Sequence, residues 1–299
     1  MLLACLLLAL ARSAAAAPRG APPAKVLLST QAVPSAKVVL VILENVDFKD
    51  AVAQPFLTRL AKDGALLRQY YAVAHPSQPN YLALVSGSTH DVFSDDNVTL
   101  DGAQLGDLLE KAGKSWRVYA EGYPGGCFLG ARRGRYVRKH VPFLSFREVQ
   151  QDPARCARIV DGARFFSDLA AGSLPDYSLF IPDLDDDGHD TGVSFADRWL
   201  AKAFGPLLPH WPADTLLIVT FDEDDYGGDN QVYTALYGSI VRPGAVSLER
   251  YNHYSLLRTM EDGLGVGTLG AKDEAASPIA GVWATPSPQP QPGLKTSAR

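Results

Sequence analysis

Short apolar runs recur along this chain of 299 residues, and several of them contain almost no polar residue. Runs of this kind are typical of strands that are covered on both faces of a sheet. The pattern therefore predicts five strands, at residues 37–43, 116–121, 177–181, 215–221 and 233–238.

Longer segments with apolar residues at helical spacing lie between these runs, and Gly or Pro ends most of them. Strands that alternate with helices of this length form a mostly parallel sheet with helices on both faces. We therefore expect an α/β fold in which ligands bind beyond the carboxyl ends of the strands of a central sheet. The predicted helices span residues 55–65, 80–87, 103–113, 194–208 and 254–265.

The two ends of the chain differ in composition from the rest. Residues 1–17 combine a short apolar run with a series of small residues, as a cleavable secretory signal peptide does. Residues 18–36 predict a linker, and the Pro-rich residues 286–299 predict a disordered tail. The folded domain is expected at residues 37–285. The signal segment predicts export, so we expect a secreted or periplasmic protein. No later segment reaches the roughly 18 apolar residues of a membrane-spanning helix.

Charge and cysteine content restrict the partners and the compartment that we expect. The formal net charge is -5 at pH 7, so there is no basic excess with which to bind nucleic acid. The hydrophobic content of 46% is enough to bury a full core. Cys5 lies in the signal segment, which leaves Cys127 and Cys156. In an oxidising compartment such a pair is most simply a disulfide.

The stretch from Asp183 to Asp190 contains five Asp residues and one His. Its start fits the calcium-binding loop of an EF-hand, but the twelfth position is Ser194 instead of Glu. A strand-like run also precedes the stretch, where an EF-hand needs a helix. We therefore interpret it as an active-site loop at the end of a strand.

Acidic and amide side chains follow three of the predicted strands. Glu44 and Asn45 follow the first strand, the acidic loop follows the third, and Asp222 and Glu223 follow the fourth. Such charges are either solvated loop residues or a crowded cluster, and a buried cluster needs a cation, a proton or N–H donors. Three clusters at equivalent edges favour a divalent cation. Oxygen ligands suit Mg²⁺, Ca²⁺ or Mn²⁺, while nearby histidines leave Zn²⁺ or Fe open.

Ser77 lies at the expected start of a helix that also contains Asn80 in its early turn. A helix N-terminus offers free N–H groups and a partial positive charge, which suit a bound phosphate and stabilise an alkoxide. Ser is also the ordinary capping residue, so this position alone does not distinguish a nucleophile from a cap. The serine-esterase motif G-x-S-x-G does not occur in the sequence.

Six motifs follow one another along nearly the whole expected domain, from residue 38 to about residue 265. They are Glu44-Asn45, HPSQPNYLALVSG (75–87), YVRKHVPF (136–143), DDDGHD (185–190), TFDEDD (220–225) and NHYSLLRTMEDGLG (252–265). Together they resemble the secreted phosphoesterases that include bacterial acid phosphatases and phospholipases C, and most closely the mycobacterial acid phosphatases. That family belongs to the alkaline phosphatase superfamily, so the resemblance implies an α/β sandwich and makes residues 37–285 a phosphoesterase domain.

The resemblance also implies a role for each matching residue. The nucleophile would be Ser77. The metal ligands would be Glu44, Asn45, Asp222 and Glu223. The residues around the phosphate would be His75, Asn80, Lys139, His140, Asp187, His189 and His253. A protonated His189 or His253 would donate to the leaving alkoxide, which favours acidic pH. No role is assigned to Asp183, Asp185 and Asp186, because this chain has extra negative charge there.

Three functions fit these residues. The first is a secreted, metal-dependent acid phosphatase that hydrolyses phosphate monoesters through a phosphoserine, with access to membrane phosphoinositides. The second is a phospholipase C or phosphodiesterase, because the same chemistry serves diesters. The third is a non-catalytic secreted protein that binds Ca²⁺, which would leave Ser77, Asn80 and His253 without a task. We expect the first function, in a monomer.

Overall fold

The computed structural model describes residues 37–285. The predicted signal peptide, linker and tail therefore lie outside the described residues. All five predicted strands are present, and three of them have the predicted bounds. These strands are β1 (Lys37–Leu43), β3 (Trp116–Ala120), β7 (Tyr177–Ile181), β8 (Thr215–Phe221) and β9 (Thr234–Tyr237).

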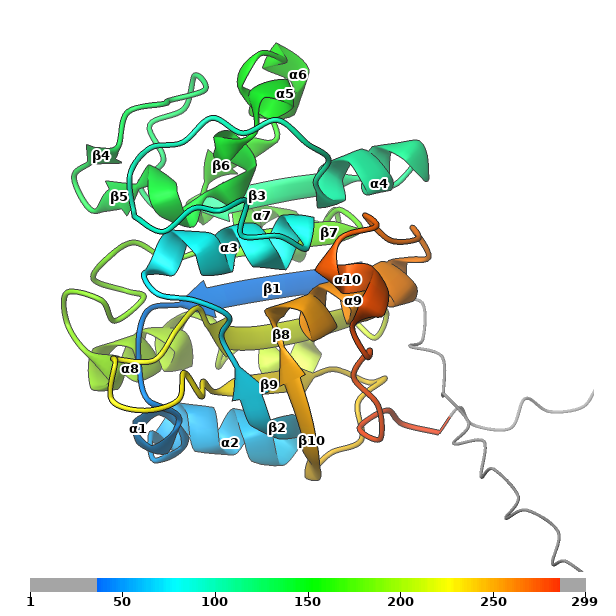
Figure 1. Cartoon of the computed structure of the whole chain (residues 1–299). Helices are drawn as coiled ribbons and strands as arrows, with labels where there is room; N and C mark the ends of the chain where they lie inside the picture. Colours follow the sequence, from blue (N-terminus) through cyan, green and yellow to red (C-terminus); the bar gives the residue numbers. More distant parts are fainter. Residues whose placement is uncertain (1–36, 286–299) are drawn as a thin grey trace, which may run out of the picture. The chain divides into compact units, whose positions relative to one another are not determined.

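Eight strands form one sheet in the order β10-β2-β9-β8-β1-β7-β3-β6. β1 pairs in parallel with β7 and β8, and β3 pairs in parallel with β7 and β6. Within residues 37–285 only β9 runs antiparallel to its neighbours in this sheet. The mostly parallel sheet is thus confirmed, and the carboxyl ends of its central strands meet at one edge (Figure 1). The additional strands are β2 (Ala65–Tyr71), β6 (Ile159–Asp161), β10 (Ala245–Asn252) and the separate pair β4 (Arg132–Arg133) and β5 (Tyr136–Val137).

Two strands at one end of the sheet, β10 at the edge and β2 beside it, lack the apolar pattern that revealed the central strands. In β10 the large apolar side chains of Val246 and Leu248 are exposed, whereas the positions that face inward hold Ala245 and Ser247. In β2 two exposed polar residues interrupt the run. Position in the sheet, more than local sequence, makes these segments strands.

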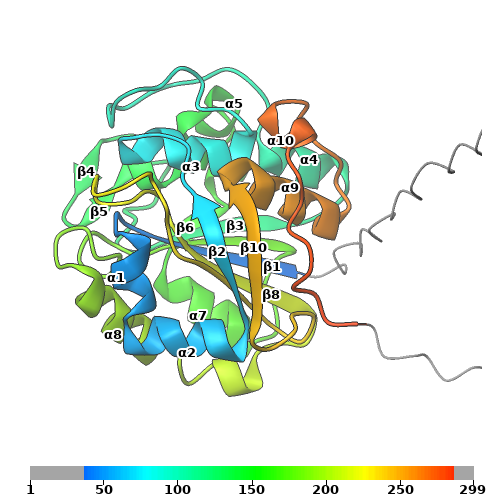
Figure 2. The ribbon, with the colours of Figure 1, turned by 60° about the horizontal axis from the view of Figure 1, so that its bottom comes forward.

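Helices cover both faces of the sheet, as predicted. Figures 1 and 2 show α3, α4, α9 and α10 on one face and α1, α2, α7 and α8 on the other. These helices are α1 (Phe48–Val52), α2 (Pro55–Asp63), α3 (Ser77–Ser86), α4 (Leu105–Lys111), α7 (Ala163–Ala170), α8 (Val193–Ala203), α9 (His253–Leu264) and α10 (Lys272–Ala275). Short turns are η1 (Arg138–His140), η2 (Pro142–Ser145), α5 (Arg147–Gln150), α6 (Pro153–Cys156) and η3 (Leu208–His210). In the described part of the chain no helix is long and apolar enough to cross a bilayer.

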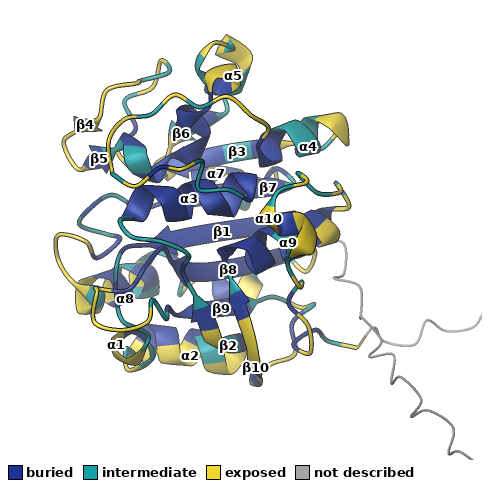
Figure 3. Cartoon of the chain, viewed as in Figure 1, coloured by how far each residue is buried: buried dark blue, intermediate teal, exposed yellow. Residues whose placement is uncertain are grey.

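The centre of the sheet and one helix are the most deeply buried parts of the described chain (Figure 3). Every residue of β7 and β8 is buried, and in β1 only Lys37 is not. Every residue of α3 is buried as well, although most helices expose a polar face. The start of α3, with Ser77, therefore lies inside the molecule at the carboxyl edge of the sheet.

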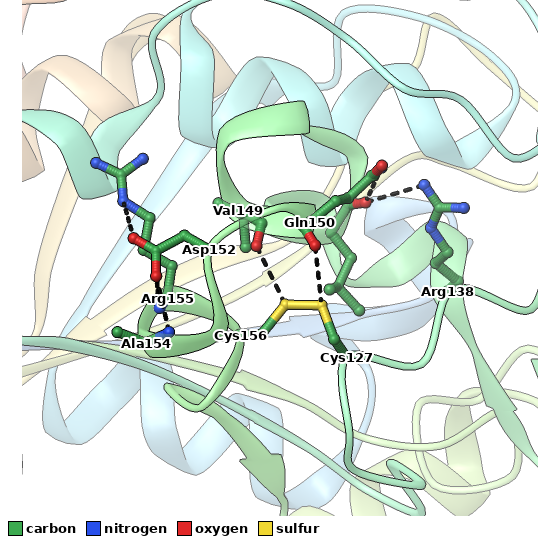
Figure 4. Close-up of a disulfide and its surroundings, with 9 residues drawn as sticks. Cys127, Arg138, Val149, Gln150, Asp152, Ala154, Arg155 and Cys156 are labelled. Carbon is green, nitrogen blue, oxygen red and sulfur yellow. Dashed lines mark hydrogen bonds and ion pairs between the residues drawn. A yellow bond between two sulfur atoms is a disulfide. The ribbon is translucent and has the colours of Figure 1, made fainter.

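The predicted disulfide is present and fastens the connection between β3 and β6. Cys127 and Cys156 are bonded, with their Cα atoms 5.2 Å apart. Figure 4 shows the two sulfur atoms against the backbone carbonyls of Val149 and Gln150. The cysteines are separated by 29 positions, and the chain-entropy model assigns a crosslink of this span about 3–4 kcal/mol of stabilisation.

A buried pair of carboxyl groups lies where α9 and α10 meet. Glu261 is fully buried, and neither of its carboxyl oxygens has a hydrogen-bond partner within residues 37–285. Asp273 is fully buried too, and it accepts hydrogen bonds from the N–H groups of Leu269 and Ala271. Burial first, and then the charge of Asp273, raise the pKa of Glu261 to about 9. Glu261 therefore keeps its proton in the folded protein at neutral pH.

We expect the free energy of unfolding to fall as the pH rises from the ordinary pKa of Glu261, 4.5, towards about 9. In this range the unfolded chain releases the Glu261 proton and the folded protein keeps it, so a higher pH favours unfolding. Glu261→Gln provides an N–H donor that needs no proton. It should raise the unfolding free energy by roughly 1–3 kcal/mol near pH 8 and change it little near pH 4. Denaturant melts across this pH range measure the effect.

The matched control is Glu274→Gln, which makes the same change at an exposed position of α10. This control should follow the wild-type profile at every pH. If Glu261→Gln shifts the unfolding free energy equally at low and high pH, the protonated Glu261 is not the cause.

Candidate active site

Backbone hydrogen bonds hold the ends of three central strands together at the carboxyl edge. The Glu44 N–H donates to the Asp187 carbonyl at 3.1 Å, which joins the end of β1 to the acidic loop after β7. The Asp222 N–H donates to the Leu43 carbonyl, also at 3.1 Å, which joins the end of β8 to β1. The three acidic segments predicted to meet at this edge therefore do meet there.

Ser77 lies among side chains from three other segments. Its hydroxyl is 3.1 Å from Glu44 Oε2 and 3.2 Å from Glu223 Oε1, as a hydrogen-bond donor to both. Lys139 Nζ donates to the same hydroxyl at 3.3 Å. Ser77 is the first residue of α3 and makes no side-chain cap. The alternative that it only caps the helix does not hold, because its hydroxyl bonds to side chains and not to helix amides.

Asn80 fixes the loop that carries Ser77. Its Oδ1 accepts from the N–H groups of Val73 and Ala74, both at 3.0 Å. Its Nδ2 donates to the carbonyls of Ala74 at 2.8 Å and Pro76 at 3.3 Å. Asn80 is fully buried, and these bonds use both ends of the amide. The amide therefore holds the loop before Ser77, and the place beside the phosphate that the resemblance implies for Asn80 stays a prediction.

Asp95 is a site residue that the sequence analysis missed. Its Oδ2 accepts from Lys139 Nζ at 2.8 Å, and its Oδ1 accepts from the Gln78 N–H at 3.0 Å. It therefore positions the Lys139 ammonium beside Ser77 and ties its own loop to the start of α3. Asp95 follows no strand and lies in the polar turn FSDDN (93–97), so no pattern in the sequence points to it.

His140 fills the interior of the site, next to Lys139 on η1. Its Nε2 lies 2.9 Å from Glu44 Oε1, and its Nδ1 lies 3.5 Å from Asp187 Oδ2. The Tyr81 ring stacks on it with centroids 4.8 Å apart and an interplanar angle of 10°. His140 is fully buried, and its ring lies between the carboxyl groups of Glu44 and Asp187.

The carboxyl groups of this cluster fit an oxygen-coordinated cation. Asp222 is fully buried, and neither of its carboxyl oxygens has a hydrogen-bond partner in the described chain. Burial, followed by the charge of Glu44, raises the pKa of both Asp222 and Asp187 well above the ordinary value. The same two causes raise the pKa of Glu223 to about 8. Crowded carboxyls with unpaired oxygens are the donor set that divalent metals prefer. Asn45, the next residue after Glu44, is partly exposed.

His75 orients Glu223 towards Ser77. Its Nδ1 lies 2.5 Å from Glu223 Oε2, and its Nε2 lies 3.3 Å from Asp224 Oδ1. The Tyr226 ring stacks on the other side of this arrangement, 4.1 Å from the His75 ring centroid to centroid. The sequence does not point to Asp224 and Tyr226, because it does not show which residues of this loop contact His75.

His189 lies at the edge of the cluster. Its side chain is 36% exposed, its Nδ1 is 2.8 Å from Asp190 Oδ1, and its Nε2 is 4.0 Å from Glu44 Oε2. An imidazole that is held on one nitrogen and open on the other can exchange a proton with a bound ligand.

His253 lies behind the cluster and not in it. Its Nε2 donates to the Asp222 carbonyl at 2.7 Å, so its Nδ1 is the acceptor for the Tyr70 hydroxyl at 2.9 Å. Burial lowers its pKa to about 4. Both ring nitrogens are therefore used inside the protein, and His253 supports Asp222 in place of the proton-donating position suggested by the sequence.

A second acidic group forms at the same edge from residues to which no role was assigned. One carboxylate oxygen from each of Glu121, Asp183 and Asp186 lies within 4.8 Å of the others, a spacing that could hold a metal ion. Asp183 Oδ1 also accepts from the N–H groups of Asp185 and Asp186 at 3.0 and 3.1 Å. Since the strand β7 precedes this loop, the EF-hand alternative is excluded.

Comparison with known proteins shows the family to which the chain belongs. A model of the phosphoesterase family matches residues 44–267. A phosphate-repressible acid phosphatase of Penicillium chrysogenum is 34% identical over 254 residues, which are 81% of this chain and 62% of that protein. A phosphatidylinositol-3-phosphatase of Mycobacterium tuberculosis is 36% identical over 272 residues, 88% of each chain. The chain spans only 56–62% of the length of three fungal acid phosphatases that it matches.

The fold has solved counterparts as well. A crystal structure of a protein in the alkaline phosphatase superfamily from Vibrio parahaemolyticus aligns with a TM-score of 0.59. The alignment covers 84% of this chain and 72% of that one at 16% identity, so this likeness concerns the fold and confirms the expected alkaline-phosphatase-like sandwich. The family model matches more than half of the chain. The chain therefore belongs to the phosphoesterase family.

Proposed function

We propose that this protein is a metal-dependent phosphate monoesterase in which Ser77 forms a phosphoserine intermediate. The position of the Ser77 hydroxyl carries the proposal, because it lies between the carboxylates of Glu44 and Glu223 and within 3.3 Å of Lys139 Nζ. A hydroxyl with proton acceptors on one side and a cation on the other is arranged for nucleophilic attack on an anionic ester. The named relatives, acid phosphatases and a phosphatidylinositol phosphatase, support the same reaction class.

In the first step the Ser77 oxygen attacks phosphorus while the ester P–O bond breaks on the opposite side. One of the carboxylates that already accept the hydroxyl hydrogen bond, Glu44 or Glu223, receives the proton. Lys139 and the N-terminus of α3 offset the charge on the equatorial phosphoryl oxygens. His189, with one nitrogen open, donates a proton to the leaving oxygen. In the second step water attacks the phosphoserine and the same groups act in reverse.

The residues that would hold the metal are Glu44, Asn45, Asp222 and Glu223. A divalent ion bound there would offset the charge of the ester and lower the pKa of the Ser77 hydroxyl. The oxygen donors favour Mg²⁺, Ca²⁺ or Mn²⁺. Zn²⁺ or Fe would depend on His189, because both ring nitrogens of His253 are already used. His253 is assigned the task of holding the Asp222 backbone in place.

Monoesters are the preferred substrate class, because a monoester dianion gains most from Lys139, the helix N-terminus and a cation together. A phosphodiesterase or phospholipase C would show higher rates on bis(p-nitrophenyl) phosphate than on p-nitrophenyl phosphate. A non-catalytic calcium-binding protein would hydrolyse neither compound. Phosphatidylinositol 3-phosphate carries a monoester phosphate on its inositol ring, beside the diester that joins the ring to the lipid, so it belongs in the substrate panel with soluble esters. We assign the protein to an oxidising compartment, as a secreted or periplasmic monomer, in keeping with its disulfide.

Removal of the metal should abolish turnover. Adding the metal back should restore turnover and the phosphoserine intermediate. We expect chelation to lower p-nitrophenyl phosphate hydrolysis by at least about 100-fold, and Mg²⁺, Ca²⁺ or Mn²⁺ to restore it. Acid quenching during turnover, followed by peptide mass spectrometry, should find the phosphoryl group on Ser77. Full activity in protein shown by metal analysis to be metal-free would contradict the proposal, as would phosphorylation at another residue.

A further inference from the structure

Tyr226 is a large aromatic residue that the structure leaves exposed at the rim of the site. It lies in the loop between β8 and β9 and is 64% exposed. One side of its ring stacks on His75, with centroids 4.1 Å apart and an interplanar angle of 25°. Most of its remaining surface faces solvent. An exposed aromatic ring that is supported from below is a ready stacking surface for a second ring.

The backbone around Tyr226 is held in one uncommon conformation. Its φ of 57° is in the left-handed region, which bulky residues rarely adopt. The Tyr226 N–H donates to Asp224 Oδ1 at 2.9 Å, and the Asn230 N–H donates to Asp224 Oδ2 at 2.9 Å. Asp224 Oδ1 is also 3.3 Å from His75 Nε2. The same carboxylate thus fixes both the loop and the histidine on which the ring rests.

A continuous chain of contacts connects the ring to the nucleophile. The Ser77 hydroxyl lies 3.2 Å from Glu223 Oε1, and Glu223 Oε2 lies 2.5 Å from His75 Nδ1. His75 in turn carries the Tyr226 ring. Tyr226 is thus the exposed end of a row of contacts that begins at the nucleophile.

The charges around Ser77 also reach the Tyr226 hydroxyl. Desolvation first, and then the carboxylates of Glu223 and Asp95, raise its pKa, while Lys139 lowers it. Asp95 and Lys139 belong to segments other than the β8–β9 loop, and Lys139 contacts both Ser77 and Asp95. The tyrosine thus lies within electrostatic reach of groups around the nucleophile.

We propose that Tyr226 is a specificity-determining residue that binds aromatic leaving groups by stacking. The inference rests on the proposed function, since it names the class of ester that the same site prefers. An aryl group gains the stacking contact and a small alkyl group does not. Aromatic stacking of this kind corresponds to about a 3- to 10-fold difference in affinity.

The first test compares an aryl and an alkyl monoester in the full-length protein. Tyr226→Ala should raise KM for p-nitrophenyl phosphate about 3- to 10-fold, with kcat, and both constants for glycerol 2-phosphate, within about twofold of wild type. Tyr226→Phe keeps the ring and should behave as wild type. Leu248→Ala, at an exposed position on the edge strand β10, is the surface control. An equal loss on both esters would show that Tyr226 only supports His75, and would overturn the proposal.

A binding measurement separates this inference from the proposed function. Phenylphosphonate and methylphosphonate are not hydrolysed, and calorimetry measures their affinities without turnover. We expect wild type to bind phenylphosphonate about 3- to 10-fold more tightly, and Tyr226→Ala to bind the two compounds alike. If this pattern holds in a protein that hydrolyses no ester, the proposed function fails and the stacking site stands. If hydrolysis is normal and the preference persists in Tyr226→Ala, the stacking site is wrong.

Discussion

Ser77→Ala should lower the hydrolysis of p-nitrophenyl phosphate by at least about 10³-fold. The variant removes the only hydroxyl that lies between Glu44, Glu223 and Lys139 in the described chain, so no other group in this position can receive the phosphoryl group. The fold should change little, since the loss is one neutral hydroxyl, with an effect of about 1 kcal/mol or less on the unfolding free energy. Steady-state kinetics and a thermal melt measure the two effects separately.

Ser86→Ala is the matched control for this variant. Ser86 is the last residue of the same helix, and its hydroxyl donates to the Leu82 carbonyl at 2.8 Å. It makes the same chemical change in α3 at the end away from the site, and activity should be kept. A folded Ser77→Ala protein with more than about a tenth of wild-type activity would rule out the phosphoserine route.

The sequence predicts a strand well where burial on both faces gives it a continuous apolar run. The strands β1, β7 and β8 lie in the middle of the sheet, so the continuous apolar runs mark their bounds. β10, at the edge of the sheet, and β2 beside it are half exposed, and β10 places Val246 and Leu248 outward, so their sequences do not show the same pattern. The pairing of these two strands depends on neighbours that are distant in sequence.

The site was predictable to the extent that parallel strands end at a common edge. This rule alone brings Glu44, Asp187 and Asp222 together, and the structure agrees. The rule does not say which way a side chain turns once it arrives. The Asn80 side chain bonds to the backbone of its own loop, and the His253 ring bonds to the backbone carbonyl of Asp222. Both residues lie near the site, but the sequence does not predict these hydrogen-bond partners. Such choices depend on three-dimensional neighbours, which no spacing along the chain reveals.

Asp222→Asn should lower the activity by at least about 100-fold and, in the same experiment, stabilise the metal-free protein. Asp222 is fully buried, its carboxyl oxygens are unpaired in the described chain, and Glu44 lies close by. Without a cation, burial and the charge of Glu44 raise the pKa of Asp222 well above its ordinary value, so folding near pH 7 requires it to take up a proton, which an amide does not need. We therefore expect a gain of roughly 1–3 kcal/mol in unfolding free energy near pH 7 for chelated protein.

A metal centre at Asp222 predicts both the loss of activity and the gain in unfolding free energy. If Asp222 had only a structural role, Asp222→Asn would instead lower the unfolding free energy. Asp214→Asn is the matched control: it makes the same substitution just before β8, at the strand's opposite end, where the residue is exposed. This control should change neither activity nor stability by a measurable amount. Denaturant melts with and without added Mg²⁺ complete the test, since the metal should stabilise wild type and have little effect on Asp222→Asn. Equal stabilisation of both proteins by metal would show that the cation does not bind at Asp222. The acidic group of Glu121, Asp183 and Asp186 would then be the candidate metal site.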